Sequence, residues 1–321
     1  MKKRCRITDL GSFVVDLMSY APRLPTAGET VKGGPFRAGP GGKGSNQAIA
    51  ARKCGADVTM ITKLGQDVFA DFAWNVYQQY GINTDYVYTD KTTGTGTALI
   101  IVEQDSAQNT IVVTPGACGN ITHAEIDGAK NKIVHSDIFL TQLEINMDAI
   151  RYGLKIAFEN HVRTILNPAP VQSVSDEIYK MISVITPNET EAALLSGIST
   201  DTPEGVRAAC RFFRKKGVSA VIVTLGKRGS YISSDEFEGM IGIVDAGNSI
   251  DTTGAGDAFN GGLAVALAEG KGIQEAAAFG AAVSGIEVTR TGTTPAMPQR
   301  EEVDRLYNRF VAESKKLKDR P

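Results

Sequence analysis

The sequence predicts an α/β protein with a doubly wound, mostly parallel sheet flanked by helices, and with a small β-sheet lid. Two observations support this. Short β-branched runs alternate with helix-like stretches along most of the chain, and two regions without helices interrupt that alternation. With 321 residues, 42% of them hydrophobic, the chain is long enough for one large core. We therefore expect residues 1–321 to form a single domain.

The alternating elements follow one another at short intervals. The predicted strands of the main sheet are 57–61, 138–142, 164–166, 184–186 and 220–224. The predicted helices are 45–54, 68–80, 148–160, 189–195, 203–216, 257–269, 273–288 and 300–317. The last three helices make the C-terminal third almost purely helical.

The predicted lid comes from residues 12–38 and 94–113, which have alternating or β-branched patterns with no helix between the paired runs. The runs 14–18 and 98–102 are typical of it. A sheet of this size cannot bury both of its faces by itself. We therefore expect it to cover a ligand site and to pair with a second subunit.

Composition excludes several classes of function. Lys plus Arg total 34 against 36 for Asp plus Glu, a net charge of −2, so no basic surface for nucleic acid or an anionic membrane is expected. The cysteines, at 5, 54, 118 and 210, form no C-x-x-C pair, which argues against zinc and disulfides and for free thiols in a reducing cytoplasm. The N-terminal segment has the pattern of neither a signal peptide nor a membrane span.

Residues 251–262, DTTGAGDAFNGG, form a glycine turn that leads directly into an apolar helical segment. Such a junction offers unpaired N–H groups and the positive end of a helix dipole, so it favours an anion such as phosphate. Asp257 at this junction is unsuited to bind phosphate but suited to act as a base toward a hydroxyl. The alternative is an ordinary helix cap. Neither G-x-x-x-x-G-K-[ST] nor G-x-G-x-x-G is present.

A second glycine cluster, residues 41–48 with the sequence GGKGSNQA, also leads into a predicted helix. Alone it is weak evidence, since such clusters are as often flexible surface loops. Together with residues 254–257 it predicts a second binding element.

These motifs resemble the ribokinase branch of the ribokinase and phosphofructokinase-B family of sugar kinases, over nearly the whole chain. The matching pieces, in order, are Gly11-Ser12 with Asp16, 25–30, 41–48, 142–144, 166–170, 186–191, 224–229 and 251–262. The resemblance implies a ribokinase-like fold and an ATP-dependent pentokinase that phosphorylates the 5-hydroxyl of D-ribose, 2-deoxy-D-ribose or both. It also implies a homodimer that forms through the lid.

The resemblance assigns roles to individual residues. Asp257 is the expected base, and Gly254, Ala255 and Gly256 form the expected anion hole. The expected sugar site comprises Val14, Asp16, Gly42, Lys43, Gly44, Ser45, Asn46 and Glu144, whose carboxylates accept from hydroxyls while Lys43 and Asn46 donate. Alternatively, these are ordinary polar residues on the protein surface. That interpretation is weak for Asp16 and Glu144 because they lie in or just after apolar strands.

The expected ATP site is formed by Asn188 with Thr224, Leu225, Gly226, Lys227, Arg228 and Gly229. Glu191, three residues after Asn188, is expected to act near Mg²⁺ through water. The same spacing is that of a helix-capping box, and both roles can coexist.

The resemblance further implies a monovalent cation, K⁺, beside the anion hole. Asp251 is expected to contribute a carboxylate, and Thr253, Glu287, Arg290 and Gly292 mainly backbone carbonyls. Ala296 departs from the family pattern, which usually has a serine hydroxyl there, so the affinity or selectivity for the cation is open.

Val14 is the second departure, because ribokinases carry asparagine at this position. Residues 14 and 16 of an extended segment project to the same side, so Val14 is expected beside the sugar. An isopropyl group there favours a sugar without the facing hydroxyl, as in bacterial deoxyribokinases. Kinases of fructose or adenosine, a non-catalytic sugar sensor and a dinucleotide-dependent oxidoreductase are the alternatives. The last lacks its glycine fingerprint after the first strand.

Overall fold

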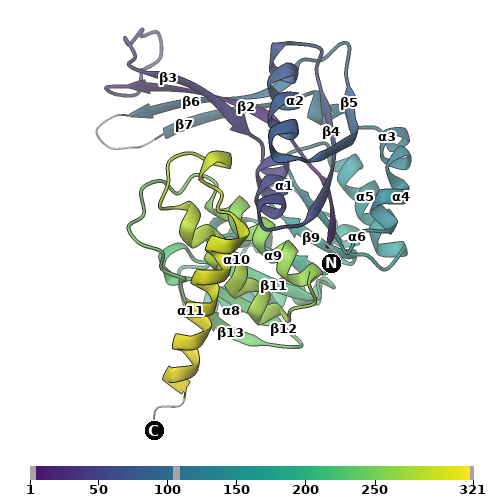
Figure 1. Cartoon of the computed structure of the whole chain (residues 1–321), viewed down its shortest axis with the longest axis vertical. Helices are drawn as coiled ribbons and strands as arrows, with labels where there is room; N and C mark the ends of the chain where they lie inside the picture. Colours follow the sequence, from purple (N-terminus) through teal and green to yellow (C-terminus); the bar gives the residue numbers. More distant parts are fainter. Residues whose placement is uncertain (1–4, 104–108, 319–321) are drawn as a thin grey trace.

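The computed structural model describes residues 5–103 and 109–318, and its largest element is a nine-stranded sheet (Figure 1). In spatial order its strands are β13 (Glu238–Ile241), β12 (Ser230–Ser234), β11 (Ala220–Thr224), β10 (Val184–Ile185), β9 (Arg163–Asn167), β8 (Ile138–Gln142), β1 (Arg6–Leu10), β4 (Asp57–Leu64) and β5 (Asn83–Thr89). All neighbouring strands are parallel except in the pairs β11–β12 and β12–β13, which are antiparallel. The mostly parallel sheet predicted from the sequence is therefore confirmed.

Helices cover both faces of this sheet, and each face has its own apolar core. One core is shared by α1 (Lys43–Lys53), α2 (Val68–Tyr80), α9 (Ala255–Ala268), α10 (Ile273–Glu287) and α11 (Arg300–Lys318). The other contains α3 (His123–Gly128), α4 (Lys130–Val134), α5 (Met147–Glu159), α6 (Asp176–Tyr179), α7 (Glu189–Ser196) and α8 (Pro203–Lys215). The doubly wound arrangement is confirmed. Three short 3₁₀ turns, η1 (Ala117–Asn120), η2 (Gly226–Arg228) and η3 (Thr294–Ala296), connect elements.

A separate four-stranded sheet extends over one side of the main body (Figure 1). Its order is β3 (Phe36–Gly41), β2 (Val14–Ala21), β6 (Thr95–Glu103) and β7 (Asn109–Gly116). The predicted segments 12–38 and 94–113 contain most of it, but β3 and β7 each continue three residues further. We refer to this sheet as the lid sheet.

The lid sheet has two different faces. The parallel pairing of Asp16 with Ala98 places both on the same face as Val14 and Ile100, and a small buried apolar cluster forms there. Leu99 and Val112 are paired on the opposite face and are 54% and 58% exposed. The exposed face is thus apolar and lacks cover within the described part of this chain.

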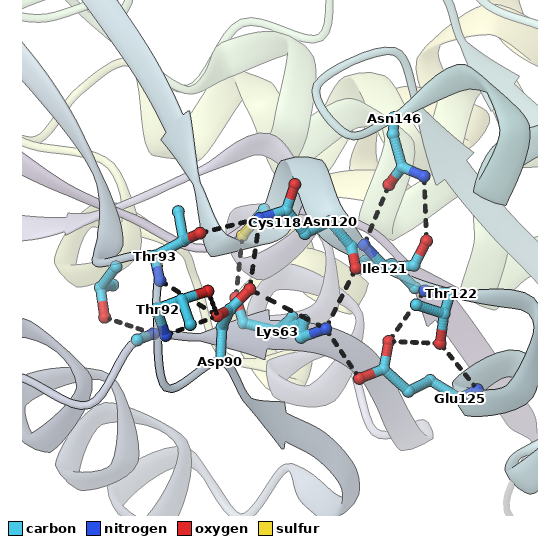
Figure 2. A network of polar contacts seen from close by, with 12 residues as sticks. Lys63, Asp90, Thr92, Thr93, Cys118, Asn120, Ile121, Thr122, Glu125 and Asn146 are labelled. Atoms are coloured by element: carbon cyan, nitrogen blue, oxygen red, sulfur yellow. Dashed lines mark hydrogen bonds and ion pairs between the residues drawn. The ribbon is translucent and has the colours of Figure 1, made fainter.

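A polar network ties the base of the lid sheet to the main body (Figure 2). The Lys63 ammonium, at the end of β4, donates to the Asn120 carbonyl oxygen at 3.1 Å and forms an ion pair with Glu125 at 3.0 Å. Asn120 also donates to the Asp90 carboxylate at 3.2 Å, and the Cys118 thiol donates to the Lys63 carbonyl at 3.3 Å. The turn between β5 and β6 is thereby joined to the segment that follows β7.

The strand order reverses at β1, because the chain places β4 and β5 on one side of β1 and β8 on the other. Ligands of open α/β sheets bind at the carboxyl ends of the strands beside such a reversal. No helix within residues 5–103 and 109–318 combines the length and the hydropathy needed to cross a bilayer.

Candidate active site

Two helix N-termini meet at the carboxyl ends of the central strands. α1 starts after Gly42 and α9 after Gly254, and these glycines have φ angles of +89° and +96°, which favour glycine. Neither helix has a side-chain cap. The two glycine motifs, more than two hundred residues apart in sequence, therefore lie together.

Asp257 lies in the first turn of α9 and is buried, with two amide side chains of α1 directed at its carboxylate. Asn46 Nδ2 donates to one carboxylate oxygen at 3.0 Å and Gln47 Nε2 to the other at 2.9 Å. These two hydrogen bonds fix the orientation of the Asp257 carboxylate. A hydroxyl proton could be accepted by the oxygen lone pairs that remain.

A buried polar chain extends from Asp257 into the sheet. Gln47, Gln142 and Asn167 belong to sequence motifs described above but were given no role, and Asp9 belongs to none of those motifs. Gln47 Nε2 also lies 3.0 Å from Asn167 Oδ1, and Gln142 Nε2 donates to Gln47 Oε1 at 3.0 Å. Gln142 continues to Asp9 at 3.2 Å, where burial raises the carboxyl pKa well above its usual range despite that bond. Gln142 and Asn167 are polar residues at the ends of the apolar strands β8 and β9, which is the signal that could have found them.

The first amides of α9 are available to an anion. Within the described residues, the Gly256 and Asp257 N–H groups make no hydrogen bond to the protein, whereas Ala255 N–H donates to the Thr252 carbonyl at 3.3 Å. Unpaired N–H groups at a helix start are what anion binding requires. The arrangement thus offers an anion hole directly beside the Asp257 carboxylate.

At the start of α1, by contrast, oxygen atoms of the protein accept hydrogen bonds from the first backbone N–H groups. Glu144 accepts the Lys43 N–H at 2.8 Å and the Ser12 hydroxyl, and the Ser45 N–H donates to the Ser12 carbonyl at 2.9 Å. Burial raises the pKa of Glu144, although Ser12 and Lys43 counteract it. The negative charge of Asp257 raises the pKa of Lys43, so its ammonium stays charged.

Asp16 faces the same space from the lid sheet. Burial raises its pKa to about 7, and the neighbouring charges of Glu144 and Asp257 add to this. Val14 lies on the same face but is only 2% exposed, packed with Ala98 and Ile100. The two residues therefore share a side, as expected, although the Val14 side chain mainly fills the lid cluster.

The predicted nucleotide residues lie along the neighbouring strand ends. Asn188 caps α7, accepting the Glu191 N–H at 2.8 Å, while the Glu191 carboxylate accepts the Asn188 amide at 2.9 Å. Asn188 also bridges to Thr224, which begins the loop 224–229, and Arg228 of that loop forms an ion pair with Glu189. The capping box is therefore present, and Glu191 keeps lone pairs for water-mediated contact with a cation.

The loop expected to hold a monovalent cation contains two carboxylates. Asp251 accepts N–H groups of Thr253 at 2.9 Å and Gly292 at 3.0 Å; these bonds outweigh burial and lower its pKa. Glu287 is completely buried with no partner for either oxygen among the described residues, and burial, followed by Asp251 and Asp257, raises its pKa to about 9. Ala296 offers no hydroxyl there.

Comparison with known proteins identifies the family. The pfkB family of carbohydrate kinases matches residues 6–300. A ribokinase from Haemophilus influenzae is 38% identical, covering 93% of this chain and 97% of its own, and a deoxyribokinase from Salmonella typhi is 34% identical, covering 95% and 98%. The structure of Arabidopsis thaliana ribokinase with ribose and ATP superposes with a TM-score of 0.86 at 30% identity, covering 96% and 99%.

The chain belongs to the pfkB family of carbohydrate kinases and is an ATP-dependent sugar kinase. The ribokinase-like fold expected from the sequence is confirmed by the solved ribokinases, among them one from Giardia lamblia with a TM-score of 0.88 and 30% identity, covering 96% of this chain and all of that one.

Proposed function

We propose that this protein transfers the γ-phosphoryl group of ATP to the 5-hydroxyl of D-ribose, 2-deoxy-D-ribose or both. The observation that carries the proposal is the Asp257 carboxylate, held by Asn46 and Gln47 beside the unpaired first amides of α9. A base and an anion site thus adjoin one another. The similarity to ribokinases and to a deoxyribokinase supports a pentose as the acceptor.

In this proposal, Asp257 accepts the proton of the sugar hydroxyl as the oxygen forms its bond to phosphorus. The amides of the 254–257 turn stabilise the charge on the transferring group. Because phosphoryl transfer has a loose transition state, the main contribution of the protein is positioning. Lys43 stays charged beside Asp257 and adds positive potential near the transferred group.

The sugar lies between the start of α1 and the lid sheet. Glu144 and Asp16 accept its hydroxyls, while Lys43 and Asn46 donate to its oxygens. The Ser12 hydroxyl and the Lys43 N–H fix Glu144 before any sugar arrives, which reduces the ordering cost of binding.

ATP lies along residues 224–229 and Asn188, with its γ-phosphate at the anion hole. Glu191 would hold Mg²⁺ through water, since its oxygens already accept the Asn188 N–H groups, and the ion would neutralise phosphate charge when bound. The Asp251 loop would hold the monovalent cation, which would supply positive charge next to the anion hole. The buried, unpartnered carboxylate of Glu287 fits a cation in this loop.

The lid sheet closes over the sugar and pairs with its copy in a homodimer. The exposed apolar side chains on the outer face of this sheet, Leu99 and Val112 among them, support this part of the proposal. We expect sedimentation at micromolar concentration to give the mass of a dimer, and Leu99→Lys with Val112→Lys to give a monomer. A wild-type monomer at that concentration would contradict the dimer.

A coupled assay of ADP release across ribose, 2-deoxyribose, fructose, adenosine and other nucleosides tests the function. We expect kcat/KM for one of the two pentoses to exceed that for every other acceptor, and phosphate to appear on the 5-hydroxyl. A preference for fructose or for a nucleoside would overturn the pentose assignment. Sugar binding without turnover of any acceptor would indicate a sensor.

A further inference from the structure

Glu287 is a buried carboxylate that contacts neither the sugar nor the nucleotide in the proposed reaction. It is the last residue of α10, it has 0% exposure, and neither of its oxygens has a hydrogen-bond partner among the described residues. Leaving a carboxylate in such a place without a partner is strongly unfavourable. Its surroundings therefore require a counter-charge or a proton.

The Glu287 side chain extends beneath the turn that forms the anion hole. A Cβ built on Gly254 would lie 2.9 Å from Glu287 Oε1, so the carboxylate touches the N-cap of α9. Asp251 and Asp257 are the charged groups that act on it most strongly, and both are negative. Three acidic groups thus surround the turn that is to receive a phosphoryl group.

No basic side chain in the described part of the chain compensates Glu287. Arg290 is nearest along the sequence, but its guanidinium forms an ion pair with Glu302 and donates to the Ala296 carbonyl at 3.5 Å. The Asp251 loop is joined to the same helix end, because the Asp251 and Ile250 N–H groups both donate to the Val288 carbonyl, at 3.2 and 2.7 Å. The two carboxylates therefore belong to one rigid corner.

We propose that the Glu287 side chain, and not only its backbone carbonyl, is a ligand of the cation in the Asp251 loop. This inference rests on the cation of the proposed function. In this site a charged carboxylate takes the place of the neutral hydroxyl ligand that Ala296 does not provide. Two carboxylates and several carbonyls form a hard, all-oxygen site of formal charge −2.

The class of ligand follows from this donor set. A second carboxylate strengthens the binding of any hard cation, and it strengthens that of a divalent ion such as Ca²⁺ more than that of K⁺ because the Coulomb attraction scales with the product of the charges. The site is therefore expected to accept a divalent ion as well as a monovalent one. In either case the bound cation removes the negative potential behind the anion hole.

Thermal unfolding of the full chain without nucleotide or sugar tests this inference. Wild type, Glu287→Gln and the control Glu269→Gln are heated in increasing KCl or CaCl₂, with choline chloride holding ionic strength constant. Glu269 lies at the far end of α9 and pairs with Arg300, so its loss lowers stability without altering the cation loop. Glu191→Gln excludes a response that arises at the magnesium position.

We expect wild type and both control variants to gain Tm at the same cation concentrations. Glu287→Gln should need at least a tenfold higher concentration for half of its gain, because the variant lacks one carboxylate ligand of the cation. This result follows from lost binding to the native state. If the glutamine variant does not fold, Glu287→Ala serves for the same titration.

An unchanged response in Glu287→Gln would overturn the role of its side chain and leave the cation site intact. No response in wild type would remove the cation altogether. Neither result bears on the acceptor assay, which reports the kinase function separately, so failure of this inference and failure of the proposed function can be told apart.

Discussion

The N-termini of α1 and α9 are built alike and used differently. Both follow a glycine with positive φ, and neither has a side-chain cap. At α1 the protein supplies its own anion, because Glu144 accepts the Lys43 N–H. At α9 the Gly256 and Asp257 N–H groups find no acceptor in the described residues. The Glu144 carboxylate thus completes one helix start, whereas two N–H groups at the other have no acceptor in the described residues. In the proposed function the first serves the sugar and the second a phosphate.

The largest expected effect lies at the α9 end. Asp257→Asn should leave sugar and ATP binding nearly intact and lower turnover by about 10²–10⁴, the usual contribution of a general base. The asparagine can still contact Asn46 or Gln47, so the fold should persist. The check is kcat by coupled assay together with calorimetric binding of sugar; turnover above half of the wild-type value would mean that Asp257 is only a structural cap.

At the α1 end, changes should alter sugar selectivity instead. If Val14 lies against carbon 2 of the sugar, Val14→Asn adds a polar partner and shifts the ratio of kcat/KM toward ribose over 2-deoxyribose by about ten- to a hundredfold, from about 1–3 kcal/mol. Val14 is packed against Ala98 and Ile100, so a loss of lid stability could also follow. Taking the ratio between two sugars cancels such a loss, and an unmoved ratio would show that Val14 only packs.

A pH dependence of sugar binding should also arise at the α1 end. The Asp16 pKa of about 7 lies above its ordinary value, so the carboxyl loses its proton between pH 6 and 8. If only the ionised form accepts sugar hydroxyls, affinity measured without nucleotide should rise about tenfold across this window. Asp16→Asn should bind weakly and with a flat profile. An equally steep profile in that variant would place the titrating group elsewhere.

The same shift has a consequence for stability. Since the folded pKa of Asp16 exceeds the unfolded one, the native state holds this proton more tightly, and the Asp16 contribution makes the protein less stable as pH rises from about 4 through 7. Sugar that hydrogen-bonds to the carboxylate opposes this loss.

The smallest expected difference concerns the two glycines. Alanine at either position lowers stability by about 1–2 kcal/mol, because a residue with a Cβ disfavours positive φ. At Gly42 its Cβ would also meet backbone atoms of Val14 and Phe13 at 2.8 and 2.9 Å, whereas at Gly254 the closest atom, at 2.9 Å, is the movable end of Glu287. Gly42→Ala should therefore lower Tm more than Gly254→Ala, by several degrees. Equal losses would contradict the rigid packing of α1 against the lid.

How much the sequence could predict depended on how local the signal was. The bounds of α2 were predicted to the residue, because Asp67 caps its start and Gly81, with φ +65°, ends it. β5 was missed because its sequence NTDYVYT mixes polar and apolar residues without a continuous run, and β12 was missed because it is short and rich in serine. Helices α3, α4 and α6 are too short to show a period.

In the candidate site too, residues in a contiguous motif could be predicted, and contacts between distant parts of the chain could not. Asp257 and its glycines could be found because the motif is contiguous. The links from Gln47 to Asn167 and to Gln142 could not, because they join positions 120 and 95 residues apart, and only the folded sheet brings these amides together. The unpartnered state of Glu287 is likewise a property of packing, since the sequence shows a glutamate that could equally face solvent at the end of a helix.

The lid sheet is joined to the main body by four chain crossings, before β2, after β3, before β6 and after β7. Lys63 and Cys118 connect three of them. Figure 2 shows Lys63 with Asp90 and Asn120, which lie before β6 and after β7. The Cys118 thiol also donates to the Phe13 carbonyl, just before β2. Because these contacts join the strands at their base, we expect the lid sheet to unfold locally as a whole and not one strand at a time. Its inner amides should exchange their hydrogens with solvent as one cooperative unit, on a timescale separate from that of the core, and sugar should slow them all together.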